Sequence, residues 1–285
     1  FFTFVVSSLN SVHKSRFPSH ADVRFSLLAR YNPTRNPTIM LIHPLTVVSA
    51  THLNLSSFLS INFLSQVSQS HRQKKKMKQQ PLEGVTVLDF GQVYNGPYCG
   101  FLLSQAGARV VKIESLLGET LRPKSKKDAS FYPFNNLNSN KECIAVDLKH
   151  SSGKEIVQAL VKEVDVVLQN FAPGTLEKFE LGASDLLNIN PRLIYATGTG
   201  YGSSEGPYKD FLGMDITLQA ISGAMSVTGE ENGPPLKTAA AYIDFLAGVH
   251  LYAGIVTALL SRNAIGRGSV VDISMQDCAF PTLST

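Results

Sequence analysis

The feature that most constrains the fold is a regular alternation of short β-branched runs with helical segments, which begins near residue 85. Six such runs predict strands: Val85–Phe90, Arg109–Ile113, Cys143–Leu148, Val166–Leu168, Leu193–Thr197 and Ser269–Ser274. Strands that alternate with helices imply an α/β fold with a mostly parallel, doubly wound sheet. Ligands of such sheets bind beyond the carboxyl ends of the strands. The candidate site walls are therefore the loops 91–97, 147–151, 169–174 and 198–206.

Turn and cap residues mark the helices between these strands. Pro97 is suited to the first turn of a helix that continues to about residue 106, where Gly107 ends it. Ser152 followed by Glu155 has the pattern of a capping box and predicts the start of a second helix, which ends near residue 164.

The segment Thr238–Leu260 is apolar and long enough to cross a membrane. It contains Asp244 and His250, and amphipathic sequence lies on both sides of it. Charged residues inside a membrane span are costly, so this pattern favours a buried helix of a globular fold.

Residues 1–80 differ in composition from the rest of the chain. They contain ten Lys or Arg residues and one acidic residue, whereas the remainder has 16 basic and 21 acidic residues. The first 80 residues are predicted to be a disordered or non-native leader, with a transit peptide as the alternative. The predicted folded part is acidic, which argues against a nucleic-acid partner.

The three cysteines, Cys99, Cys143 and Cys278, are odd in number and widely spaced. They predict neither a disulfide framework nor a metal site, and they fit a reducing compartment. We therefore expect a cytoplasmic location, or a mitochondrial one if the leader is a transit peptide. The first predicted strand is followed by neither a dinucleotide fingerprint nor a triphosphate-binding loop.

Polar residues near predicted helix starts and strand ends are the candidate functional residues. Asp244 near a helix start is either an ordinary helix-terminal carboxylate or a poorly solvated nucleophile or base. Asp215 reads locally as a helix cap. Tyr201 lies in a Gly-rich loop that forms either a turn or an anion site. Asn170 and Phe171 follow a strand and offer a hydrogen-bonding amide and a stacking ring.

From about Pro81 to Thr285 the chain resembles the family III CoA-transferases, a family that includes formyl-CoA transferase and α-methylacyl-CoA racemase. The segments that carry the resemblance are Leu82–Phe90 with Gly96 and Pro97, Gly107–Glu114, Asn138–Lys149, Asn170–Gly174, Gly200–Gly202, Ser222–Gly229 and Gly266–Asp272.

The resemblance implies that Asp244 is the catalytic residue, with Asp215 in a supporting position. In the family's transferases this carboxylate attacks an acyl-CoA thioester and forms an aspartyl mixed anhydride. The released thiolate then converts the anhydride to an aspartyl-CoA thioester, which the acceptor carboxylate takes over. Acyl-CoA and a carboxylic acid are the expected substrates, with no permanently bound cofactor and no metal.

Two alternatives to CoA transfer stay open. Racemase members carry a His where this chain has Met214, and Met cannot move a proton, so transfer is favoured over racemisation or a related isomerase or dehydratase reaction. The other alternative is an inactive CoA-binding fragment.

The resemblance also implies the CoA-binding residues. The pantetheine and thioester end is expected at Val93, Tyr94 and Asn95, the adenine and phosphates at Asp147, Leu148, Lys149, Asn170, Phe171 and Lys178, and the arm between Thr199 and Tyr201. Formyl-CoA transferase has Gln where Tyr94 stands, so we expect an acyl group other than formyl.

The family fold has a Rossmann-like large domain and a smaller second domain, in an interlocked homodimer. We expect residues 81–212 to form the CoA-binding part of the large domain. Residues 213–285 are expected to carry the catalytic Asp and a following strand, and to end before the small domain. No membrane partner is expected.

Overall fold

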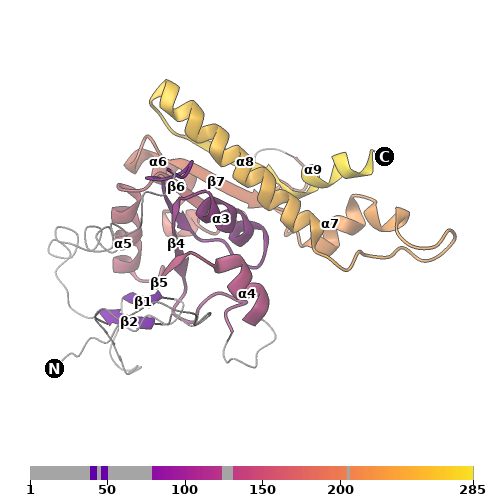
Figure 1. Ribbon diagram of the computed structural model, residues 1–285, viewed down its shortest axis with the longest axis horizontal. Coiled ribbons are helices and arrows are strands. Elements are labelled where there is room, and N and C mark those ends of the chain that lie inside the picture. The colour runs from indigo at the N-terminus through magenta and orange to yellow at the C-terminus, as the bar shows by residue number, and fades with distance from the viewer. Residues whose placement is uncertain (1–38, 44–45, 51–78, 124–130, 204–205, 285) are drawn as a thin grey trace, which may run out of the picture.

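A computed structural model describes residues 39–43, 46–50, 79–123, 131–203 and 206–284. An eight-stranded sheet in the order β2-β1-β5-β4-β3-β6-β7-β8 forms its centre (Figure 1). Six neighbouring strands run parallel: β3 (Thr86–Asp89), β4 (Arg109–Glu114), β5 (Glu142–Val146), β6 (Val166–Gln169), β7 (Ile194–Thr199) and β8 (Ser269–Ser274). Each overlaps a predicted strand, and their order is that of the doubly wound dinucleotide-binding fold. The predicted fold class is confirmed.

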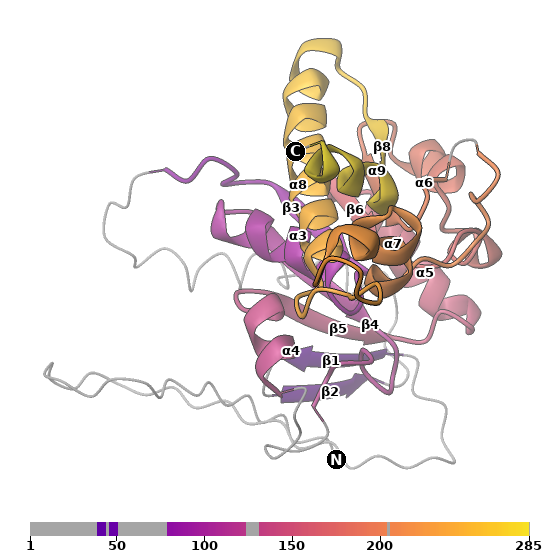
Figure 2. The same cartoon turned by 90° about the vertical axis from the view of Figure 1, so that its right-hand side faces the viewer.

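Two further strands extend the sheet at the β5 edge. β1 (Ile39–His43) and β2 (Thr46–Ala50) form an antiparallel hairpin, and β1 pairs antiparallel with β5 (Figure 2). Both lie within residues 1–80, for which the sequence predicted a leader. The rest of that prediction falls outside the described residues, apart from Gln79 and Gln80.

Helices connect the parallel strands and cover both faces of the sheet. The α-helices are α3 (Asn95–Gln105), α4 (Phe131–Asn138), α5 (Ser151–Val161), α6 (Ala183–Ile189), α7 (Asp215–Ile221), α8 (Tyr242–Ile265) and α9 (Met275–Ala279). The short 3₁₀ helices are η1 (Glu177–Phe179), η2 (Ala224–Val227) and η3 (Phe280–Leu283). Because β8 is the sixth parallel strand and α8 its crossover helix, residues 242–274 belong to the same sheet unit as residues 86–199.

The sheet separates two hydrophobic cores, one on each of its faces. Successive strand residues point to opposite sides, so Val87 packs with α3 and α8 while Leu88 packs with α5 and α6. Both side chains are almost completely buried. A third, smaller cluster joins the start of α8 to α7 and α9 through Ile243, Leu218 and Met275. This third cluster fixes how α7 meets the first turn of α8.

α8 (Tyr242–Ile265) is shifted toward the C-terminus from the predicted segment Thr238–Leu260, and it is the one described helix that is long and apolar enough to span a membrane. That test is weak evidence, because the core helix of a globular domain passes it too. Ile243, Ala247, Leu251 and Ile255 are spaced four residues apart and fully buried, so one stripe of α8 packs into the protein.

The predicted capping box at Ser152 is wrong. α5 begins one residue earlier, at Ser151, and its N-cap is His150, whose Nδ1 accepts from the Ser152 backbone N–H at 3.3 Å. Gly153 allows this start, since a Cβ at that position would lie 1.9 Å from the carbonyl oxygen of Asp147. The close approach of helix and strand end therefore decides where the helix begins.

Candidate active site

The strand order reverses between β3 and β6, and the loops after these two strands meet at the carboxyl edge of the sheet. The side-chain amide of Asn170 holds the backbone of Gln92: its Oδ1 accepts from the Gln92 N–H at 2.7 Å and its Nδ2 donates to the Gln92 carbonyl at 2.9 Å. Asn170 was predicted to contact CoA. In the structure its amide oxygen and its amide nitrogen each make one hydrogen bond to the first loop, and contact with CoA stays a prediction.

The loop 90–94 passes through a tight space before it enters α3. A Cβ on Gly91 would lie 2.7 Å from both Asp89 Oδ1 and the backbone of Gly96, so glycine is required there. Val93 adopts a left-handed conformation with φ of 63°. A β-branched residue in this region carries strain of about 1–3 kcal/mol and persists only where its surroundings hold it.

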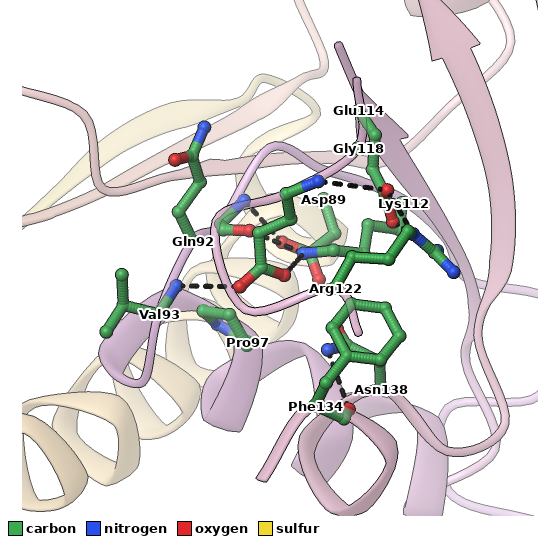
Figure 3. A network of polar contacts seen from close by, with 12 residues as sticks. Asp89, Gln92, Val93, Pro97, Lys112, Glu114, Gly118, Arg122, Phe134 and Asn138 are labelled. Carbon is green, nitrogen blue, oxygen red and sulfur yellow. Dashed lines mark hydrogen bonds and ion pairs between the residues drawn. The ribbon is translucent and has the colours of Figure 1, made fainter. Parts of the chain in front are cut away.

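A buried ionic network lies under this loop (Figure 3). Lys141 pairs with Asp89 at 2.8 Å, Lys112 with Glu119 at 2.9 Å, and Arg122 with Glu114 at 2.5 Å. Arg122 is partly exposed, and the other five side chains are almost completely buried.

The network binds the loop backbone directly. Asp89 Oδ1 accepts from the Gly91 N–H at 2.7 Å, Lys112 Nζ donates to the Gly91 carbonyl at 2.6 Å, and Lys141 Nζ donates to the Pro97 carbonyl at 2.8 Å. Glu119 Oε1 accepts from the Val93 N–H at 3.1 Å. The loop is therefore fixed along its whole length.

Burial and pairing act in opposite directions on the two lysines. Burial lowers the pKa of Lys112, but Asp89 and Glu119 together raise it above its ordinary value. Burial lowers the pKa of Lys141, and Asp89 offsets this only in part. These residues were not predicted from the sequence. Asp89 and Lys112 lie within apolar strands, and a charged residue in such a strand indicates a buried ion pair.

Asp244 lies in the first turn of α8 and is partly buried. Burial and the neighbouring carboxylate of Asp215 raise its pKa to about 7, and the backbone N–H of Asn95 lowers it in part. Near neutral pH this carboxyl group exchanges readily between its charged and neutral forms. A poorly solvated carboxylate of this kind is suited to nucleophilic or base chemistry.

Asp215 caps the helix that carries Asp244. Its Oδ2 accepts from the backbone N–H groups of Ile243 at 2.9 Å and Asp244 at 3.3 Å, and its Oδ1 accepts from Gln219 Nε2 at 2.5 Å. Gln219 Oε1 accepts from the Thr238 N–H, which positions the segment before α8. The sequence suggested a cap for Asp215, and the structure shows that the capped helix is α8.

Asn95 connects three elements at this point. It is the first residue of α3, its Nδ2 donates to the Gly198 carbonyl of β7 at 3.2 Å, and its backbone N–H interacts with Asp244 of α8. A Cβ on Gly248 would lie 2.9 Å from the Asn95 carbonyl oxygen, so α8 packs closely against the start of α3. Asn95 is buried and is placed to position Asp244.

Aromatic rings surround the Asp244 turn. Phe245 packs edge-on against Tyr98, with centroids 4.9 Å apart, and its ring lies 5.9 Å from that of Tyr94. Tyr94 and Phe245 are both partly exposed. The residue that follows Asp244 therefore packs against two aromatic rings from the start of α3.

The other predicted CoA contacts fall into two groups. Thr199 ends β7 and is buried, and Tyr201 packs on the third core cluster beside the Asp244 turn. The second group follows β5 and β6 at the same edge: Asp147, Leu148, Lys149, Phe171 and Lys178. Lys149 and Lys178 are exposed there. β5 and β6 are three strand positions apart, roughly 14 Å at the usual spacing, so this group does not form one cluster.

Among the described residues no group of three or more His, Cys, Asp or Glu could hold a metal ion. The three cysteines are buried and unpaired. The chemistry that the described residues offer at this edge is carboxylate chemistry at Asp244.

The strand order and the carboxylate at the carboxyl edge define an α/β protein with a doubly wound sheet and a candidate nucleophilic aspartate. Residues 82–285 match the family model described as CoA-transferase family III. This chain belongs to that family.

Known relatives agree with this assignment. The chain is 41% identical over 197 residues to formyl-CoA:oxalate CoA-transferase of Streptomyces avermitilis, which covers 68% of this chain and 48% of that protein. It is 34% identical over 236 residues to an acyl-CoA transferase of Fusarium pseudograminearum, covering 79% and 52%. The solved CAIB/BAIF family protein from Brucella suis superposes with a TM-score of 0.68 at 34% identity, covering 73% and 56%. The chain spans about half the length of the curated relatives it matches.

Proposed function

We propose that this chain carries the catalytic aspartate of a CoA-transferase that moves CoA from an acyl-CoA to a carboxylic acid. The observation that carries the proposal is Asp244: a partly buried carboxyl group, fixed between the start of α3 and the cap residue Asp215, with a pKa of about 7. Membership of CoA-transferase family III supports it.

In the proposed reaction an Asp244 carboxylate oxygen attacks the thioester carbonyl carbon, the C–S bond breaks, and CoA leaves as the thiolate. The product is a mixed anhydride between Asp244 and the acyl group. The thiolate then attacks the Asp244 carbonyl carbon, which releases the acyl group as its carboxylate and leaves Asp244 as a CoA thioester. The acceptor carboxylate repeats these two steps in reverse order, so that Asp244 is regenerated. Dividing one acyl exchange into several steps is the usual benefit of covalent catalysis.

The aromatic rings near the Asp244 turn indicate which size of acyl group the site binds. The S. avermitilis relative is named for formyl-CoA and oxalate. Formyl has almost no apolar surface, whereas Tyr94 and Phe245, the residue after Asp244, offer two partly exposed rings that lie 5.9 Å apart. We infer an acyl group larger than formyl, because burying apolar surface against these rings favours binding.

Racemisation or dehydration is the competing reaction, since a carboxylate with a pKa near 7 can also act as a base. Met214 precedes Asp215, is largely exposed, and cannot donate a proton from the opposite side of a substrate carbon. This favours transfer. An inactive CoA-binding protein is the other alternative, and homodimer formation and a cytoplasmic location stay predictions.

Hydroxylamine trapping tests the proposal. The full-length protein is incubated with acyl-CoA donors, from formyl-CoA to succinyl-CoA, and then with hydroxylamine, and the peptides are analysed by mass spectrometry. A hydroxamate at Asp244, absent from Asp244→Asn, is the expected result. Turnover without modification of Asp244 would exclude the covalent route. Deuterium uptake from solvent at the carbon next to the thioester, without an acceptor acid, would instead identify racemisation.

A further inference from the structure

The buried pair of Lys112 and Glu119 holds the two sides of Gln92 in the first loop. Lys112 Nζ donates to the Gly91 carbonyl at 2.6 Å, and Glu119 Oε1 accepts from the Val93 N–H at 3.1 Å. The two side chains also contact each other at 2.9 Å through Glu119 Oε2. Figure 3 shows Val93, Lys112 and Gly118, the residue before Glu119, at this point. One ion pair therefore binds the backbone on both sides of Gln92, at the Gly91 carbonyl and at the Val93 N–H.

Glu119 is placed to hold a conformation that Val93 does not favour. Val93 has φ of 63°, which a β-branched residue disfavours, and its side chain is 37% exposed. Its N–H donates to a carboxylate that is 2% exposed and paired with Lys112. The hydrogen bond that the Val93 N–H donates to this charged, buried acceptor helps to hold Val93 in this conformation.

The conformation of Val93 determines how the chain enters α3. Tyr94 is the N-cap of that helix, and Asn95 is its first residue. The helix α8 packs closely against this point, since a Cβ on Gly248 would lie 2.9 Å from the Asn95 carbonyl oxygen, and the backbone N–H of Asn95 interacts with Asp244. Glu119 therefore binds the backbone at Val93, two residues before Asn95, whose N–H interacts with the carboxylate that the proposed reaction uses.

We propose that Glu119 is a positioning residue for the reaction at Asp244: by accepting from the Val93 N–H it holds the first loop so that the Asn95 N–H faces Asp244 and the Tyr94 ring packs against Phe245. This inference rests on the proposed function. Glu119 takes no part in bond making, and its effect reaches the substrate through Val93.

Loss of Glu119 alone would leave the buried Lys112 without its ion-pair partner at 2.9 Å and could destabilise the fold as a whole. The test therefore compares two double variants in which the charge pair is removed from both. Lys112→Met with Glu119→Gln keeps an oxygen for the Val93 N–H, whereas Lys112→Met with Glu119→Met does not. The loss of the Lys112 contact to Gly91 is common to both, so the comparison isolates the acceptor.

Three measurements on the full-length protein follow: kcat and KM for CoA exchange, the pH dependence of kcat, and hydrogen exchange of residues 91–94. We expect kcat to be at least tenfold lower in the Met variant than in the Gln variant, with KM for acyl-CoA and the melting temperature similar in both. Amide exchange in the loop should be faster in the Met variant. The acidic limb of its pH profile should move to higher pH, because Asp215 still faces Asp244 from α7 while the Asn95 N–H no longer stabilises the carboxylate.

Glu119→Asp provides a second comparison in which the charge on Lys112 stays neutralised and folding is preserved. The shorter side chain withdraws the carboxylate from Val93, so kcat should fall and loop exchange should rise. Equal kcat and equal pH profiles in the two double variants, or wild-type kcat in Glu119→Asp despite faster loop exchange, would overturn the inference while the proposed function stands. A wild-type protein that shows turnover but no modification at Asp244 would overturn the proposed function and the inference together.

Discussion

The Asp215 carboxylate on α7 accepts from the backbone N–H of Asp244 on α8, with Oδ2 and N 3.3 Å apart. This contact has two effects. It caps the first turn of the helix that presents Asp244, and it places a negative charge beside the Asp244 carboxyl group, which raises the pKa of that group. The structure thus couples the position of the candidate nucleophile to its ionisation.

Replacing Asp215 with Asn separates these effects. The amide oxygen can still cap α8, but the charge is gone, so the pKa of Asp244 should fall from about 7. The acidic limb of the kcat/KM profile for CoA exchange should therefore move to lower pH. Because the Asn amide group would face the donating Nε2 of Gln219, we also expect a loss of about 1–3 kcal/mol in unfolding free energy. An acidic limb that stays in place would show that Asp215 does not set the ionisation of Asp244.

Asp244→Asn should abolish transfer and stabilise the protein at alkaline pH. The pKa of about 7 in the folded state lies above the ordinary aspartate value of 3.8, so the folded state binds the proton more tightly and stability falls as pH rises from about 4 to about 7. Above that range wild-type protein carries a poorly solvated charge, and removing it should raise the unfolding free energy on the order of 2 kcal/mol. Urea unfolding at pH 5 and pH 8 checks this. A gain that is larger at pH 5 would contradict it.

The buried pair of Lys141 and Asp89 predicts a strong asymmetry between single and double variants. Lys141→Met leaves the buried Asp89 without its direct ion-pair partner and should cost about 3–5 kcal/mol of unfolding free energy. Adding Asp89→Asn removes the charge and keeps an acceptor for the Gly91 N–H, so most of that loss should be recovered.

The exposed pair of Lys154 and Glu180 is the matched control, with side-chain exposures of 26% and 70%. Lys154→Met should change the unfolding free energy by less than about 1 kcal/mol. Urea denaturation of all three variants provides the comparison. Equal losses at the buried and exposed pairs would contradict the assigned role of burial.

Tyr94→Gln tests the inferred preference for an acyl group larger than formyl. The change removes the aromatic ring that packs against Phe245, the residue after Asp244, and leaves the backbone of the loop in place. We expect kcat/KM for larger acyl-CoA donors to fall about tenfold relative to that for formyl-CoA, since a methylene or ring contact is worth about 1–3 kcal/mol. Tyr132→Gln, an exposed tyrosine on α4, is the control. Unchanged ratios in Tyr94→Gln would remove Tyr94 from the acyl site.

Much of the fold follows from local sequence patterns. The six parallel strands were predicted from β-branched runs because buried parallel strands are nearly continuous in apolar residues. The placement of Asp244 in the first turn of a long helix was also predicted, with the start of α8 displaced by a few residues. The capping box at Ser152 was wrong because the close contact of Gly153 with Asp147 outweighs the local signal.

The site was predicted less completely. The role of Asp244 came from a family resemblance, since its local pattern fits an ordinary helix terminus equally well. The sequence placed Asn170 at the right edge of the sheet, but not its hydrogen bonds to Gln92, which lies 78 residues away in the chain. Glu119 and Lys141 carried no recognised local pattern.

The amino-acid sequence by itself determined the alternation of strands and helices, the edge at which the loops gather, and the helix turn that carries Asp244. Only the tertiary structure decided that Asp215 caps α8, that Lys112 and Glu119 bind the backbone of the first loop, and that Asn95 interacts with Asp244. The physical reason is that hydrophobic period and capping are properties of a few neighbouring residues. Hydrogen bonds and ion pairs between distant segments depend on strand order, which exists only once the sheet has formed.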